Sequence, residues 1–316
     1  MGQSCGTAVA DELCHALAVE LGSATFNLDN VPSMSTFVSC CQGLITLDKE
    51  ASTVRLIHLT LQEYLSAHDD ILFSRPHSAI AEICLTYLNS QRVKALSTRA
   101  SPNTQNIPFL EYCSAYWGIY AKRELSGCGR SLALELLKGH YGEISTRSII
   151  GRAHPDYTEG WGNYSPFGGL HCASFFGIVE LVTTLIEMGS YDINEGDFSG
   201  CTPLAWAAHN GHEEVVKILL GREEVNLDKP DCYCQTPLLH AAWTEHEGMV
   251  RILLRREEVN PDKPNSYGQT ALSYAAWNGH EGVVKILLGR EEVDPDKPDD
   301  RGRTPLLFTS RNGHEG

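Results

Sequence analysis

Cysteine and histidine are the residues of this chain that could coordinate a metal ion or act as nucleophiles. The sequence holds 11 cysteines, and the close pairs are Cys40 with Cys41 and Cys232 with Cys234. No Cys-x-x-Cys spacing occurs, which argues against a zinc knuckle or a thioredoxin-type site. The odd, scattered count instead favours free thiols that behave as small buried hydrophobes in a reducing cytosol.

Histidine recurs every 34 residues, at His212, His246, His280 and His314. Side chains on successive packed units lie about 10 Å apart, which is too far for them to share one ion. We therefore expect these histidines to begin helices. The chain also has no Gly-x-Ser-x-Gly, His-Glu-x-x-His or Gly-x-x-x-x-Gly-Lys-[Ser/Thr] motif. The sequence predicts no enzyme, no metal or other cofactor and no small-molecule substrate.

The composition narrows the class of protein. Of 316 residues, 42% are hydrophobic, and 25 Lys and Arg against 40 Asp and Glu give a formal net charge of −15. This apolar fraction supports a buried core, and the acidic balance argues against nucleic-acid binding, which needs Lys and Arg to neutralise phosphates. No apolar run approaches the roughly 20 residues of a membrane helix, and the first residues do not resemble a signal peptide. We expect a cytoplasmic protein without a membrane partner.

An internal repeat determines the helices and hairpins that would position a functional site. Thr202-Pro203-Leu204 returns at Thr236, at Thr270 as Thr-Ala-Leu and at Thr304, always after 34 residues, and a degenerate copy begins at Gly168. Threonine caps a helix and proline fits its first turn, so each copy should start a helix there. A second apolar face, such as that of residues 213–220, predicts a second helix. Each copy is then a helix pair with a connecting hairpin, and the copies must stack to bury both faces.

This pattern resembles the ankyrin repeat over residues 163–316, in about five copies of which the last is expected to be truncated. Two departures stand out. Glu245 replaces a glycine that ends a helix, and Cys234 replaces a glycine of the hairpin turn, where a left-handed conformation costs a residue with a Cβ about 1–2 kcal/mol.

The resemblance implies a concave face, lined by hairpin tips and the ends of the first helices, that binds another protein. The positions matched to that face are Phe198, Cys201, His209, Asn210, Tyr233, Gln235, Trp243, Thr244, Tyr267, Gln269, Trp277, Asn278, Arg301, Arg303, Arg311 and Asn312. Four of them, Tyr233, Trp243, Tyr267 and Trp277, form what we call the aromatic strip, because large rings dominate interface energetics.

An alternative interpretation makes Trp243 and Trp277 partly buried packing residues that are alike because a repeat was duplicated. The same alignment predicts that the positions one helical step inward belong to the core. In the third copy this position is a histidine, which we expect to be buried with its hydrogen bonds satisfied. These positions are Trp206, His240, Tyr274 and Phe308.

The first half of the chain is not repetitive. Helices are predicted over residues 11–21, 33–42 and 60–66, with a hairpin of strands 44–47 and 53–57. This order, and residues 54–65 in particular, resembles the winged-helix module of fungal NACHT-ankyrin proteins, which are NLR-like nucleotide switches. The resemblance implies a module over residues 1–76. His58 matches the histidine of a Met-His-Asp triplet that contacts diphosphate in that family, but Ile57 and Leu59 depart from the triplet.

Residues 77–160 are predicted to form a helical linker bundle. Ile80, Ile83, Tyr87 and Leu88 share one expected apolar face. A second expected face holds Phe109, Cys113, Tyr116, Trp117 and Tyr120, and a third begins at Leu132, Leu136 and Leu137. Stripes of this kind are core far more often than they are cofactor contacts.

The predicted fold class is mainly α, with a winged-helix-like module and a helical bundle followed by a repeat solenoid. The predicted function is non-catalytic protein recognition through the concave face, as the sensor part of an NLR-like signalling protein. The alternative is a fragment of a nucleotide-driven switch, in which the winged helix contacts nucleotide only when an upstream NACHT domain is present.

Overall fold

A computed structural model describes residues 10–20, 26–48, 50, 53–57, 59–67, 75–94, 109–138 and 167–313. Internal contacts divide the chain into two compact units, residues 1–158 and 159–316. Among the described helices, none has the length and apolar character needed to cross a membrane.

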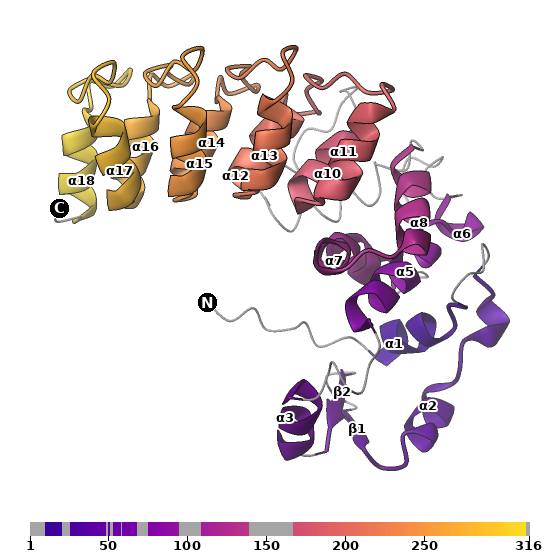
Figure 1. The fold of residues 1–316 in the computed structure, drawn as a ribbon. Helices are drawn as coiled ribbons and strands as arrows, with labels where there is room; N and C mark the ends of the chain where they lie inside the picture. The colour runs from indigo at the N-terminus through magenta and orange to yellow at the C-terminus, as the bar shows by residue number, and fades with distance from the viewer. Residues whose placement is uncertain are drawn as a thin grey trace. The chain divides into compact units, whose positions relative to one another are not determined.

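The first unit is mainly helical (Figure 1). Its elements are α1 (Ala10–Leu17), the 3-10 helix η1 (Leu28–Asn30), α2 (Met34–Cys40), β1 (Ile45–Asp48), β2 (Thr53–Leu56), α3 (Leu59–Ala67), α5 (Pro76–Leu88), α6 (Gln91–Lys94), α7 (Leu110–Arg123) and α8 (Gly127–Lys138).

The predicted hairpin is confirmed. β1 and β2 pair antiparallel, with Ile45 opposite Leu56 and Asp48 opposite Thr53. The helix before it begins at Ser33, whose hydroxyl accepts a hydrogen bond from the Thr36 amide. The first helix is shorter than expected and ends at Leu17, whereas α3 matches its prediction closely. His58 lies outside the described residues.

The helices of the predicted bundle pack with α5 against both α7 and α8. Trp117 and Cys113 on α7 and Leu85 on α5 are fully buried at the centre. The expected face of α5 was partly wrong, because Ile80 and Ile83 are only half-buried while smaller residues of the helix, Ala81 and Cys84, are covered completely. Small side chains let α7 approach closely, so the buried face is displaced from the one with the largest apolar residues.

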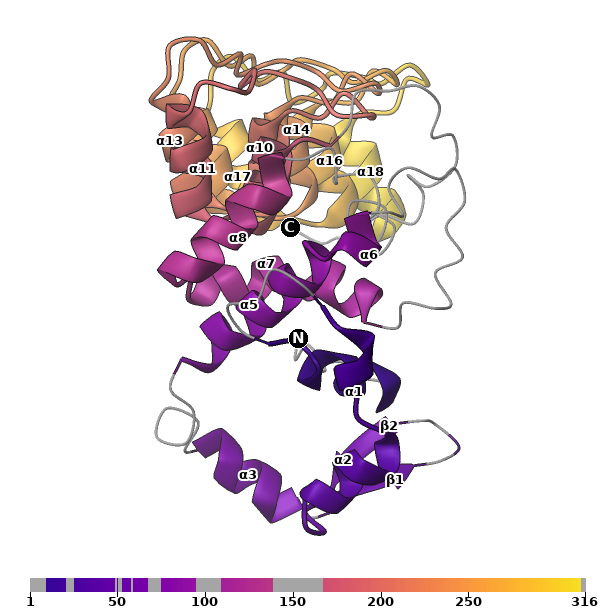
Figure 2. The ribbon, with the colours of Figure 1, turned by 90° about the vertical axis from the view of Figure 1, so that its right-hand side faces the viewer.

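The second unit stacks helix pairs side by side, and the loops that join successive pairs lie along one side of the stack, at the same end of every helix pair (Figures 1 and 2). The first helix of each repeat is α10 (Gly169–Phe176), α12 (Pro203–His209), α14 (Pro237–Trp243), α16 (Ala271–Asn278) or α18 (Pro305–Asn312). The second helices are α11 (Val179–Glu187), α13 (Glu213–Leu220), α15 (Glu247–Leu253) and α17 (Glu281–Leu288).

Three of the first helices start with the predicted threonine cap, whereas Thr304 precedes α18 without a side-chain bond and Gly168 precedes α10. The hydroxyls of Thr202, Thr236 and Thr270 accept hydrogen bonds from amides three residues on. Alanine pairs at the middle of these helices, such as Ala207 and Ala208, are completely buried where neighbouring first helices meet. The absence of larger side chains there lets the helices stack closely.

His212, His246 and His280 precede the second helices, and the rings of His212 and His280 join their repeats to the one before. Nε2 of His212 lies 2.8 Å from the carbonyl oxygen of Phe175, and Nε2 of His280 lies 2.9 Å from that of Trp243. In front of His212 a glycine with positive φ makes room for the ring, because a Cβ added at Gly177 would come within 2.5 Å of His212, whereas Glu245 holds the matching position in front of His280. The prediction that these histidines begin helices is confirmed for His212, His246 and His280, which are N-caps, and His314 lies outside the described residues.

Candidate functional site

The hairpin tips are built around one acidic or amide side chain per repeat, at Asp197, Asp231, Asn265 and Asp299. All four are buried, and in each the Oδ1 atom accepts hydrogen bonds from the amides two and four residues further on. These bonds fix the turn. Successive tips are then linked through the backbone, since the amide of Ser266 donates to the carbonyl of Tyr233.

This scaffold holds the two tyrosines of the aromatic strip outward. The side chains of Tyr233 and Tyr267 are 42% and 55% exposed. Their carbonyls accept bonds from the next hairpin, at 2.9 Å and 3.1 Å, so the two tyrosines occupy equivalent places one repeat apart. Cys234, at φ +59°, takes the left-handed conformation that Gly200 and Gly268 take in neighbouring repeats, and the turn keeps its form.

The two tryptophans of the strip lie at the ends of the first helices and are 45% and 36% exposed. Each tryptophan packs against an aromatic residue in the first helix of the next repeat. That residue lies one helical turn before the position equivalent to the tryptophan. The rings of Trp243 and Tyr274 are 5.0 Å apart and nearly perpendicular, and those of Trp277 and Phe308 are 5.1 Å apart. The packing interpretation therefore describes one side of these rings, while the exposed part is what the binding interpretation requires.

Three of the polar residues predicted at the ends of the first helices turn toward their own helices. The side chains of Asn210, Thr244 and Asn278 donate to carbonyls four residues earlier, at 3.0–3.1 Å. They satisfy the open end of the helix, which leaves less of their hydrogen-bonding capacity for a partner. Phe198, His209, Gln235 and Gln269 are half-buried.

The predicted arginines divide into two kinds. Arg301 and Arg311 are exposed, whereas Arg303 donates to Oδ2 of Asp299 through Nε at 2.8 Å and forms an ion pair with it. Burial by itself would raise the pKa of Asp299, but the hydrogen bonds from Arg303 and Arg301 outweigh it and lower that pKa. The Arg303 guanidinium also lies over the Phe308 ring, 4.8 Å from its centre.

Cys201 does not belong to the surface. It was matched to the concave face, yet it is only 3% exposed, because the following hairpin covers it. The core predictions for Trp206, His240 and Phe308 are confirmed, and Tyr274 is half-buried with its hydroxyl 2.9 Å from Nδ2 of Asn265.

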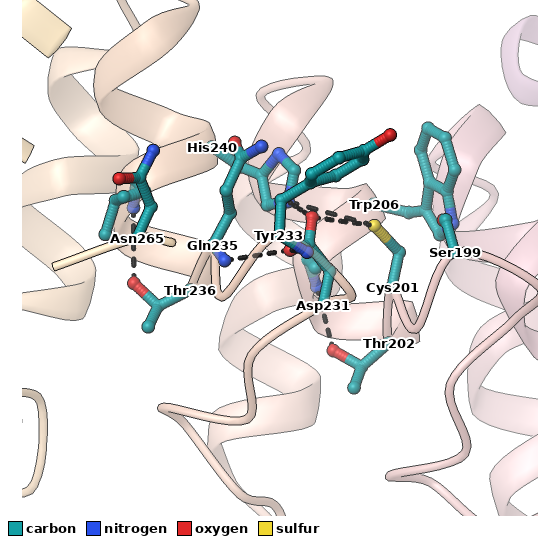
Figure 3. A network of polar contacts seen from close by, with 12 residues as sticks. Ser199, Cys201, Thr202, Trp206, Asp231, Tyr233, Gln235, Thr236, His240 and Asn265 are labelled. Carbon is teal, nitrogen blue, oxygen red and sulfur yellow. Dashed lines mark hydrogen bonds and ion pairs between the residues drawn. The ribbon is translucent and has the colours of Figure 1, made fainter. Parts of the chain in front are cut away.

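Sequence reasoning missed a cluster that forms between the second and third repeats. Cys201 from one hairpin, Asp231 from the next and His240 from α14 bring their polar atoms together below the surface (Figure 3). Burial raises the pKa of the Cys201 thiol well above its usual range, and the charges of Asp197 and Asp231 raise it further. The available signal was the repeat register, which places a cysteine one residue before Thr202 and a histidine four residues after Thr236.

Comparison with known proteins bears on the second unit. No curated protein matches the chain. Three overlapping matches to the family model described as ankyrin repeats cover residues 170–265, 226–299 and 257–316. The match agrees with the stacked helix pairs, the threonine caps and the 34-residue step. The C-terminal region of this chain therefore consists of ankyrin repeats.

Proposed function

We propose that the repeats bind another protein through the aromatic strip, on the concave face of the stack, and perform no catalysis. Ankyrin repeats generally mediate protein–protein interaction, and the observation that carries the proposal is the exposure of Tyr233, Trp243, Tyr267 and Trp277 at equivalent places of adjacent repeats. Large rings with one polar end are the side chains that most often dominate an interface.

The surface suits this role because it is fixed before a partner arrives. Backbone bonds join the hairpin tips, and ring contacts hold Trp243 and Trp277 against the next repeat. A partner then orders few side chains on binding, which lowers the entropic cost of association.

Site-specific photo-crosslinking tests the proposal. A photoreactive phenylalanine analogue replaces Tyr267 or Trp243 in the full chain, and the matched control carries it at Leu288 or Met188, which are exposed apolar residues on or next to second helices. We expect one protein to be crosslinked from the strip positions and not from the controls. Equal crosslinking from both sets would contradict a binding face at the strip.

Alanine substitution supplies the second measurement. Truncating a hot-spot ring costs about 2 kcal/mol or more, or roughly 30-fold in affinity for the crosslinked partner. We expect that loss for Tyr267→Ala, and an unchanged affinity for Leu288→Ala. An unchanged affinity for Tyr233→Ala, Trp243→Ala, Tyr267→Ala and Trp277→Ala together would reject the proposal.

We also propose that the chain acts as the sensor part of an NLR-like switch of the fungal NACHT-ankyrin type. What supports this is the order of α2, the β1–β2 hairpin and α3 ahead of the repeats, which agrees with a winged-helix module. The chain should then bind no nucleotide by itself. Titration with fluorescent ADP tests this, since micromolar binding would reveal an autonomous phosphate site and contradict it.

A further inference from the structure

Three potential metal ligands converge between the second and third repeats. Nε2 of His240 lies 3.3 Å from Oδ2 of Asp231, and Sγ of Cys201 lies 3.7 Å from that oxygen and 3.8 Å from the same nitrogen. Each residue is at least nine-tenths buried. Figure 3 shows the three side chains pointing toward one another from two hairpins and a helix.

The spacing of the three atoms fits one ion. A tetrahedral Zn²⁺, with bonds of about 2.3 Å to sulfur and about 2.0 Å to nitrogen and oxygen, holds its donors about 3.3–3.6 Å apart. The observed separations of 3.3, 3.7 and 3.8 Å need only a slight closure to reach those values. Thiolate, imidazole and carboxylate are also the donors that Zn²⁺ takes in proteins.

The surroundings hold the donors in place. Oδ1 of Asp231 accepts the amides of Tyr233 and Gln235, both at 2.8 Å, which directs Oδ2 of Asp231 at the cluster. The amide of Cys201 donates to Oδ1 of Asp197 at 3.0 Å, and this bond fixes the backbone that carries the thiol. Outer contacts of this kind orient metal ligands and raise affinity.

The other junctions between described repeats have neither a cysteine nor a histidine at the matching positions. Between the first two repeats the matching residues are Phe167, Asp197 and Trp206, between the third and fourth they are Gln235, Asn265 and Tyr274, and between the fourth and fifth they are Gln269, Asp299 and Phe308. There the space is filled by ring packing, as between Phe167 and Trp206 at 5.8 Å, or by a bond from Asn265 to the Tyr274 hydroxyl. The fold itself therefore needs neither the cysteine nor the histidine at these positions, whereas an aspartate recurs as the residue that fixes the hairpin turn.

We propose that Cys201, Asp231 and His240 form a binding site for one Zn²⁺ ion that joins the second and third repeats. Binding releases the thiol proton to solvent, and the resulting thiolate and the carboxylate together balance the charge of the ion. The fourth position of the tetrahedron goes to water. Because ligands come from both repeats, the bound ion stabilises their interface by mass action.

Cobalt spectroscopy on the full chain tests the site. The protein is stripped with a chelator under a non-thiol reductant and titrated with Co²⁺, which occupies zinc sites and absorbs in the near ultraviolet only when a thiolate is bound. We expect the absorption to saturate at one equivalent, one equivalent of Zn²⁺ to abolish it, and Zn²⁺ to raise the melting temperature of the stripped protein.

The chain supplies replacements that suit the fold. Asp231→Asn and His240→Tyr introduce the residues found at the same places in the next repeat, and Cys201→Ser is nearly isosteric. Each variant should keep the helical circular dichroism and lose Zn²⁺ affinity by more than about 100-fold, since even outer-shell changes cost 10–100-fold. Cys172→Ser, at another buried thiol, should keep the affinity, as should the double variant Cys232→Ser/Cys234→Ser, which removes two exposed thiols.

Two results would overturn the proposal. One is a wild-type chain that shows no thiolate-to-cobalt absorption. The other is absorption that survives Cys201→Ser or disappears in Cys232→Ser/Cys234→Ser, which would assign the metal to exposed thiols instead.

Discussion

The ring of Trp243 stands edge-on to the ring of Tyr274 in the following repeat, with 5.0 Å between their centres and 87° between their planes. Nearly half of the Trp243 side chain still faces solvent. A residue of the aromatic strip thus joins two repeats while part of its ring stays exposed, so under the proposed function its replacement should affect stability as well as binding.

The coupling between these two rings is measurable. Perpendicular aromatic pairs contribute about 0.5–1.5 kcal/mol beyond the area they bury. In a double-mutant cycle of Trp243→Ala and Tyr274→Leu, we expect the two losses in the free energy of unfolding to sum to more than the loss in the double variant, by that amount. Urea titration followed by circular dichroism gives the four values. Additive losses would show that the two rings do not interact.

Glu245 holds a position that glycine occupies in the other repeats. Its φ is +62°, a conformation that costs a residue with a Cβ about 1–2 kcal/mol, and Gly177, Gly211 and Gly279 take it freely. Replacing Glu245 also removes the ion pair, at 3.7 Å, between its carboxylate and Nδ1 of His280. This pair contributes little to stability because the glutamate side chain is exposed. After the extra freedom of an unfolded glycine is deducted, Glu245→Gly should stabilise the chain by about 0.5–1 kcal/mol in urea unfolding.

The reverse change at Gly211 is the matched control. An added Cβ would lie 2.6 Å from Cε1 of His246, and φ there is +71°. Gly211→Ala should therefore destabilise the chain by more than Glu245→Gly stabilises it. Equal and small effects at both sites would mean that backbone strain at this position has little influence on stability.

The sequence predicts the repeats well and the contacts between them poorly, for a physical reason. Threonine caps and prolines act within one helix, so their outcome can be deduced from one copy. The meeting of Cys201 with Asp231 and His240 depends on how far one repeat is translated and rotated from the next, which no single copy specifies. The same holds for Asn312, which looks free to bind a partner until the carbonyl of Trp277 in the preceding repeat is placed 2.7 Å from its Nδ2.

The first unit shows a second limit. Helical periodicity identified α5, yet it selected Ile80 and Ile83 for the core, whereas the close packing of α7 buries Ala81 and Cys84. Hydrophobic size indicates that a helix has an apolar face, and the shape of the neighbouring helix decides which residues that face includes.

Asp197 shows why the hairpin carboxylate differs from one repeat to the next. Its Oδ2 accepts the Nε1 proton of Trp206 at 2.8 Å, and tryptophan can only donate there. In Asp197→Asn the amide NH₂ can take either of two places. It either faces the tryptophan proton, or it replaces Oδ1 and the turn loses its acceptor. We expect a loss of about 1–3 kcal/mol in the free energy of unfolding, the cost of leaving a buried donor without an acceptor.

The fourth repeat provides the contrasting case. Asn265 donates through Nδ2 to the hydroxyl of Tyr274, which can rotate and become the donor instead. Asn265→Asp should therefore cost much less than Asp197→Asn in the same urea titration. A comparable loss in both variants would contradict this explanation of the Asp and Asn choice.

Acid should weaken the repeat stack through His246. Burial lowers the pKa of His246 below its ordinary 6.5, and nearby His280 adds to that effect, while the His209 carbonyl and the carboxylates of Glu213 and Glu245 oppose it. As pH falls through about 6.5, the unfolded chain takes up a proton that the folded chain resists, so the free energy of unfolding decreases. Urea titrations from about pH 7.5 to about pH 5.5 should show this decline, and His246→Gln, which cannot titrate, should make it shallower. An unchanged slope in His246→Gln would mean that other groups, among them buried His171, cause the decline.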